Sequence, residues 1–131
     1  KAILTNVIQS YRQKFRTENS IFIKMWPKKS TLAGWYVRLI ASGYQRPHIH
    51  PAGWLSGVIY LKVVPSLNQN EGAIEFDIGG KFSKGNYSKI THNPQVGDIV
   101  FFPSSLYHGT VPFYSDAERI IISFDLMPKE I

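Results

Sequence analysis

The sequence predicts an all-β sandwich or barrel preceded by one helix. Short runs rich in β-branched and aromatic residues recur along most of the chain. Gly, Pro, Asn and Ser separate these runs, as expected for tight turns between strands. Many short strands with turn signals between them are typical of sandwiches and barrels.

The first predicted element is a helix over residues 3–16, and strands follow it. Apolar side chains recur there at the helical spacing and form one stripe: Ile3, Leu4, Val7, Ile8, Tyr11 and Phe15. Beyond Asn19 the helical period does not return. The predicted strands are residues 21–26, 32–41, 55–64, 73–78, 87–90, 98–102 and 119–126. No internal repeat or linker interrupts them, so we expect a single domain over residues 1–131.

Composition narrows the range of functions. The chain has 131 residues, of which 44% are hydrophobic, which is enough for one core and too little for two. The absence of cysteine excludes disulfides, thiolate metal ligands and a cysteine nucleophile. The net charge is +6, but Lys28 and Lys29 are the only adjacent basic pair, so we expect no nucleic-acid partner.

Membrane and targeting signals are also lacking. No apolar run approaches the ~20 residues of a membrane span, and no signal-peptide pattern opens the sequence, so we expect no membrane partner and a cytoplasmic location. The first residue is Lys1 and not Met, which is compatible with a piece cut from a longer protein.

Two of the four histidines, His48 and His50, are separated by one residue. In extended backbone, residues two apart point to the same side, so both imidazoles can reach one point. Pro47 and Pro51 flank the pair and stiffen it. An H-x-H pair can also arise with no metal role, so the pair alone does not decide between metal binding and a structural or surface role.

A third histidine, His108, follows the predicted strand 98–102 after a short loop. Imidazole is a borderline ligand that suits Fe, Zn, Cu and Ni. We therefore predict a metal site formed by the H-x-H pair and His108. His92 has no companion and is assigned a structural or surface role.

Arg119 begins a strongly apolar predicted strand, on which it shares a face with Ile121 and Ser123. Burying a guanidinium is costly unless an anion meets it. A carboxylate would accept two parallel hydrogen bonds from the guanidinium, and a nearby tyrosine hydroxyl could add another. The alternative is a salt bridge to a neighbouring acid: Glu118, Asp116 or Asp125.

The order of these motifs resembles the iron(II) and 2-oxoglutarate oxygenases of the prolyl-hydroxylase-like superfamily. The chain is similar to the bacterial "putative 2OG-Fe(II) oxygenase" group, which is often found behind tetratricopeptide repeats. The resemblance covers about residues 34–125, through HIHPAGWLSGVIYL, EGAIEF, PQVGDIVFFPSSLYHGTVPF and RIIISFD. It implies a double-stranded β-helix, the jelly-roll barrel that cupins share.

The same resemblance implies an activity and residue roles. The enzyme would be a dioxygenase (hydroxylase) that uses Fe(II) and O2, decarboxylates 2-oxoglutarate to succinate, and acts on a small-molecule or peptidyl substrate. His48 and His108 match the two constant metal histidines of the superfamily. Arg119 would hold the distal carboxylate of 2-oxoglutarate, and Tyr60 would hydrogen-bond to the same group.

Two positions depart from the superfamily pattern. His50 stands where Asp or Glu is usual, so either three histidines bind the metal, or His50 lies behind the ligands and an acidic side chain or water takes the third place. Ile121 stands where a serine often helps to bind the co-substrate. Ser123 carries the nearest hydroxyl on the same face and is the candidate for that role.

Two other functions stay open. A cupin-type metal barrel could perform other chemistry, although cupins usually place a glutamate soon after H-x-H and Arg119 would have no role there. A non-catalytic binding domain could keep the barrel without turnover. Six aromatic residues could line a substrate pocket or fill the core: Trp35, Tyr36, Trp54, Tyr107, Phe113 and Tyr114.

Overall fold

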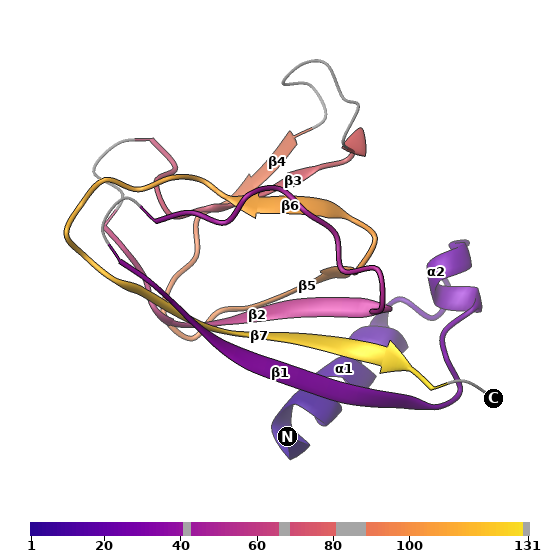
Figure 1. Cartoon of the computed structure of the whole chain (residues 1–131). Coiled ribbons are helices and arrows are strands. Elements are labelled where there is room, and N and C mark those ends of the chain that lie inside the picture. The colour runs from indigo at the N-terminus through magenta and orange to yellow at the C-terminus, as the bar shows by residue number, and fades with distance from the viewer. Residues whose placement is uncertain (41–42, 66–68, 81–88, 130–131) are drawn as a thin grey trace.

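Two antiparallel sheets form the body of the molecule (Figure 1). The computed structural model describes residues 1–40, 43–65, 69–80 and 89–129. Within them the large sheet has the strand order β1-β7-β2-β5, and the small sheet has the order β4-β3-β6. The strands are β1 (Ser30–Leu39), β2 (Leu55–Lys62), β3 (Ile74–Asp77), β4 (Lys89–His92), β5 (Ile99–Pro103), β6 (Tyr107–Thr110) and β7 (Arg119–Pro128).

Strands that pair in these sheets are mostly distant in sequence. The last strand, β7, lies between β1 and β2, and β2 pairs on its other edge with β5. In the small sheet β3 pairs with both β4 and β6. Two such sheets packed face to face form a jelly roll. The all-β, double-stranded β-helix predicted from the sequence is thus confirmed.

An apolar core fills the space between the two sheets. Val58, Tyr60 and Ile121 contribute from the large sheet, and Ile74 and Phe76 contribute from the small sheet. Because side chains alternate along a strand, the residues of β7 with odd numbers share this inward face. That alternation brings polar residues of β7 into the barrel beside the apolar ones.

Two helices cover the outer face of the large sheet. Helix α1 (Ala2–Lys14) crosses β1 and β7 in Figure 1, and its Ile8 belongs to one apolar cluster with Leu55 of β2 and Phe124 of β7. The ring of Phe124 occupies the space where Gly57 would carry a Cβ. Both faces of β2 are therefore buried, which explains why this strand is an apolar run and not an alternating one. No helix in the described ranges is long and apolar enough to cross a membrane.

The strand predicted over residues 21–26 is wrong, because α2 (Ile21–Lys24) is a short helix. Phe22 and Trp26 are four residues apart and therefore lie on one side of this turn, with ring centroids 5.4 Å apart. Phe22 also stacks on Trp54 at 5.6 Å. Packing of these aromatic rings against the sheet outweighs the β-branched composition of the segment.

Other boundaries differ less. The predicted helix begins and ends within two residues of α1. Strand β6 is not among the predicted strands, and its sequence Tyr-His-Gly-Thr contains a glycine and only one β-branched residue. Residues 87 and 88 of the predicted strand 87–90 lie outside the described residues, and β4 begins at Lys89.

Candidate metal centre

His48 and His108 lie directly opposite each other on paired backbone. The N–H of His48 donates to the carbonyl oxygen of His108 at 2.8 Å, and the N–H of His108 donates back at 3.1 Å. The pairing continues with a bond of 3.0 Å from the N–H of Thr110 to the carbonyl oxygen of Gln45. Side chains of opposed residues point to the same face of a sheet. The two imidazoles are therefore side by side, with ring centroids 4.5 Å apart.

Gly109 permits this close approach. A Cβ at position 109 would lie 2.9 Å from the carbonyl oxygen of Gln45 and 3.0 Å from the nitrogen of Pro47. Any side chain there would push the segment that carries His48 away from β6. The glycine that follows His108 is thus a requirement of the site.

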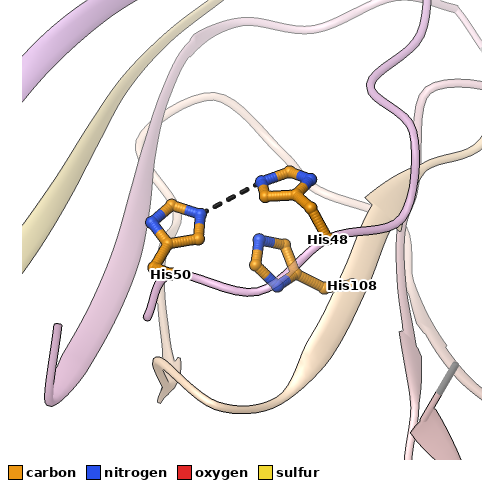
Figure 2. Close-up of side chains that lie close together, drawn as sticks. All are labelled: His48, His50 and His108. Carbon is orange, nitrogen blue, oxygen red and sulfur yellow. Dashed lines mark hydrogen bonds between the residues drawn. The ribbon is translucent and has the colours of Figure 1, made fainter. Parts of the chain in front are cut away.

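His50 completes the cluster. Its backbone N–H donates to the carbonyl oxygen of Ser104 at 2.9 Å, which fixes the chain beside β5. Its ring centroid lies 5.0 Å from those of both His48 and His108. Figure 2 shows the three rings directed toward a common point.

Hydrogen bonds on the far side of each ring fix which nitrogen carries the proton. The Nδ1 of His48 lies 2.6 Å from the carbonyl oxygen of Arg46, and the Nδ1 of His108 lies 2.8 Å from that of Leu106. The Nδ1 of His50 lies 2.9 Å from each carboxylate oxygen of Asp125. Carbonyl and carboxylate oxygens only accept, so each Nδ1 donates. In the neutral rings each Nε2 then presents a lone pair to the common point.

Converging lone pairs repel one another unless a cation lies between them. The dashed line in Figure 2 joins the Nε2 atoms of His48 and His50, which are 3.1 Å apart: a proton on either atom makes this contact a hydrogen bond, and without it two lone pairs face each other. A ligand atom of His108 lies within 4.8 Å of both. Two nitrogens about 2.1 Å from one ion at roughly a right angle would be about 3 Å apart. Burial, with smaller effects of the neighbouring imidazoles, lowers the pKa of His108 to about 4, so its ring is neutral at pH 7. The residues present fit a borderline divalent metal ion.

Asp125 lies behind His50, on the inward face of β7. Its carboxylate also accepts a hydrogen bond of 2.6 Å from the hydroxyl of Ser56, which lies 2.7 Å from the hydroxyl of Ser104. Burial by itself raises the pKa of Asp125, but the hydrogen bonds from His50 and Ser56 outweigh it, so the pKa lies below its ordinary value. Asp125 is therefore ionised at neutral pH.

Arg119 and Tyr60 form a second polar group in the barrel. Arg119 is only 2% exposed and Tyr60 is fully buried at 0%. The guanidinium carbon of Arg119 lies 5.3 Å from the centre of the Tyr60 ring. Among the described residues, neither the Tyr60 hydroxyl nor the Nε and Nη1 atoms of Arg119 have a hydrogen-bond partner. Burial raises the pKa of Tyr60, which keeps its hydroxyl protonated and able to donate.

One cavity connects the two polar groups. Its volume is about 50 Å³, room for a few water molecules in this ligand-free state. The three histidines line one part of it and Arg119 lines another, with Ser123 also on the wall. Trp35, which is 41% exposed, stacks on His50 with ring centroids 5.9 Å apart and also lines the cavity. A ligand bound here could touch the histidines and Arg119 at once.

The structure thus brings together most of the residues singled out in the sequence. The alternative, a salt bridge from Arg119 to Glu118, Asp116 or Asp125, is not found among the described residues: Glu118 pairs with Arg38 and Lys62 on the surface, and Asp125 contacts His50. His92, left outside the site, lies 3.2 Å from Asp98 on an exposed strand. Sequence reasoning missed the contact of Asp125 with His50. The signal for it was available, since Asp125 shares the inward face of its strand with Arg119.

A family model matches most of the chain. The family described as "Putative 2OG-Fe(II) oxygenase" matches residues 33–125. No curated protein sequence matches the chain.

Solved structures of low sequence identity share the fold. A Pseudomonas putida prolyl-4-hydroxylase superposes with a TM-score of 0.63 at 13% identity, covering 94% of this chain and 63% of that one. HygX from Streptomyces hygroscopicus, with nickel, 2-oxoglutarate and hygromycin B bound, has a TM-score of 0.63 at 12% identity, covering 89% and 64%. A 2OG-Fe(II) oxygenase family oxidoreductase from Burkholderia pseudomallei has a TM-score of 0.62 at 13% identity, covering 80% and 46%.

The chain spans less than two thirds of the length of each of these structures. The family match, in contrast, takes in most of this chain, including all three histidines, Tyr60 and Arg119. The chain therefore belongs to the 2OG-Fe(II) oxygenase family that matches residues 33–125.

Proposed function

We propose that this chain is an Fe(II)- and 2-oxoglutarate-dependent dioxygenase that hydroxylates a small-molecule or peptidyl substrate. The observation that carries the proposal is the single cavity lined by both the histidine cluster and Arg119. A cupin-type metal site would need only the histidines and gives Arg119 no role. A dicarboxylate co-substrate needs both ends of the cavity.

In this proposal His48, His50 and His108 hold the metal by their Nε2 atoms. Three ligands on one side leave positions for a chelating keto acid and for oxygen. Bound Fe(II) would supply the redox chemistry that couples decarboxylation of 2-oxoglutarate to hydroxylation. The neutral ring of His108 supports this role, because a protonated imidazole cannot bind a metal.

Arg119 would bind the distal carboxylate of 2-oxoglutarate, and Tyr60 would donate a further hydrogen bond to it. The partnerless Nε and Nη1 atoms of the guanidinium support this role, because buried polar groups in native proteins almost always have partners. Ser123 lies on the same inward face and lines the cavity, so we assign its hydroxyl to the co-substrate as well. The exposed ring of Trp35 at the cavity wall marks the side from which the substrate would enter.

A titration with 2-oxoglutarate tests the proposal. Under anaerobic conditions, adding 2-oxoglutarate to the Fe(II)-loaded protein should produce the weak visible charge-transfer band of a chelated keto acid. Arg119→Lys keeps the charge but loses the planar fork, so 2-oxoglutarate affinity should fall roughly 10–100-fold while iron binding stays. Arg38→Lys, at an exposed arginine on the outer face of β1, is the matched control and should change neither.

The measurement can also reject the assignment. If Fe(II) binds but 2-oxoglutarate produces no band and no succinate is released, the dioxygenase function is wrong. A cupin-type metal site without 2-oxoglutarate chemistry is then the better assignment. If Arg119→Lys leaves succinate release unchanged, the co-substrate site is elsewhere. The cytoplasmic location expected from the sequence stays a prediction.

A further inference from the structure

The geometry points to Asp125 as a positioning residue that supplies negative charge to the metal centre through the ring of His50. The inference rests on the proposed metal site and adds to it a residue that does not itself touch the metal. In the superfamily pattern an acidic side chain occupies the position of His50 and binds the metal directly. Here the acid would act from behind the histidine.

The first argument is the asymmetry among the three rings. His48 and His108 donate their Nδ1 protons to backbone carbonyl oxygens, which are neutral. His50 alone donates to a carboxylate, with both oxygens of Asp125 at 2.9 Å. A carboxylate that accepts from a metal-binding histidine fixes the ring and raises the basicity of the other nitrogen. The ring of His50, the residue that differs from the superfamily pattern, is therefore made more electron-rich than the other two.

The second argument concerns the charge of the cavity. None of the described residues that line it is acidic, while Arg119 brings a positive charge into it. A divalent ion added to neutral histidines would raise that positive charge further. Asp125 is 8% exposed and lies one side chain away from the cluster, with both carboxylate oxygens 2.9 Å from the Nδ1 of His50. It is placed to offset the ion without occupying one of the open metal positions.

A purely structural role for Asp125 predicts different behaviour. The carboxylate also holds Ser56, and Gly53 packs against Ser104 with no room for a side chain. In a structural role, Asp125 would use its hydrogen bonds to His50 and Ser56 to hold the loop after His50 against the large sheet. In that case the shape and hydrogen bonds of the side chain would matter, and its charge would not.

Metal affinity separates the two roles, measured by titration calorimetry with Co(II) or Ni(II) alone. Asp125→Asn keeps the size but removes the charge, and we expect ~10–100-fold weaker metal binding. Ser56→Ala removes a hydrogen bond to the carboxylate but leaves its charge, so the loss should be clearly smaller. Asp98→Asn is the matched control, because it removes the same charge from an exposed Asp–His pair that does not line the cavity, and the affinity should not change.

A second background, His50→Asp, tests whether Asp125 acts through His50. With His50→Asp the protein would bind the metal by a carboxylate directly, next to the carboxylate of Asp125. Adding Asp125→Asn should then raise metal affinity, the reverse of its effect on the unaltered chain. Such a change of sign is the coupling expected when one residue acts through the other.

Two results would overturn the inference. One is a folded Asp125→Asn protein whose metal affinity stays within about threefold of the unaltered chain. Such a change is too small for a residue that tunes a metal ligand by a hydrogen bond. The other is an equal loss of affinity in both backgrounds, which would show that Asp125 acts independently of His50. Both concern metal affinity only, so they are distinct from failure of the dioxygenase proposal, which is detected by the absence of 2-oxoglutarate-dependent succinate release.

Discussion

The two polar ends of the cavity differ in how completely the protein satisfies them. At the histidine end, each imidazole has a hydrogen-bond acceptor behind it: a backbone carbonyl for His48 and His108, and Asp125 for His50. At the arginine end, two guanidinium nitrogens of Arg119 and the hydroxyl of Tyr60 have no partner among the described residues. The histidine end, which we call the braced end, has its hydrogen bonds formed, and the arginine end has donors without acceptors.

The arginine end is the one that depends on a ligand. Partners behind a metal-binding ring orient it in advance, so little order has to be gained when an ion binds. A buried guanidinium whose nitrogens lack partners lowers the free energy of unfolding that the protein would otherwise have. Such a cost persists in a native protein when a ligand offsets it or when function needs it. The arginine end therefore predicts an anionic ligand more strongly than its sequence alone did.

Removing a metal ligand should produce the largest effect. His108→Ala leaves two histidines and should abolish binding of Co(II) or Ni(II), measured by calorimetry and by metal content after gel filtration. His92→Ala is the matched control, since His92 is exposed on β4 and does not line the cavity. Equal metal binding by both variants would break the distinction between the braced end and the rest of the barrel.

Replacing the arginine should separate stability from function. Arg119→Met removes a buried charge of which two nitrogens have no partner among the described residues, so the ligand-free protein should gain about 1–3 kcal/mol in free energy of unfolding while 2-oxoglutarate binding is lost. Urea unfolding monitored by tryptophan fluorescence measures the gain. Arg38→Met, at an arginine that pairs with Glu118 on the surface, should change stability by less than ~1 kcal/mol. A large loss of stability in Arg119→Met would mean that the guanidinium has partners in the ligand-free protein.

The histidine end should show its own dependence on pH. The pKa of His108 is about 4 in the folded protein and 6.5 ordinarily, so the unfolded chain binds more protons between these values. The contribution of neutral His108 to the stability of the metal-free protein is therefore fully present above pH 6.5 and is lost as the pH drops toward 4. The loss should be on the order of 2 kcal/mol, allowing for partial solvent screening. His108→Gln should flatten this part of the stability profile; an unchanged slope would assign it to other groups.

Local sequence patterns predicted much of the fold because each strand carries its own turn signals. The exceptions are two short elements. Helix α2 depends on ring contacts of Phe22 with Trp54, which is distant in sequence. Strand β6 depends on pairing with β3 and with the segment around His48, since its own four residues have weak strand preference.

For the site, local patterns identified residue types, and the family resemblance supplied their arrangement. The spacing of His48 and His50 indicates that both can reach one point, but nothing local shows that His108 joins them. That convergence comes from a backbone bridge between residues sixty positions apart. The contact of Asp125 with His50 spans 75 residues and has no local signal beyond the face on which Asp125 lies. Long-range pairing of this kind is a property of the sheet register and not of any single segment.

The smallest expected effect comes from Tyr60, and it tests whether the arginine end works as a unit. Tyr60→Phe removes one donor to the charged carboxylate of 2-oxoglutarate, so affinity should fall by about 1.5 kcal/mol, roughly 10-fold. The ligand-free protein should not lose stability, because the deleted hydroxyl has no partner there.

Val58→Ala, at an apolar core neighbour on the same face of β2, is the contrasting variant: it should destabilise the protein by about 1–3 kcal/mol through lost packing. Calorimetry with 2-oxoglutarate on the metal-loaded protein and urea unfolding of the metal-free protein supply the two numbers. Should Tyr60→Phe cost stability and leave 2-oxoglutarate affinity unchanged, Tyr60 belongs to the core, and Arg119 would have to hold the carboxylate without it.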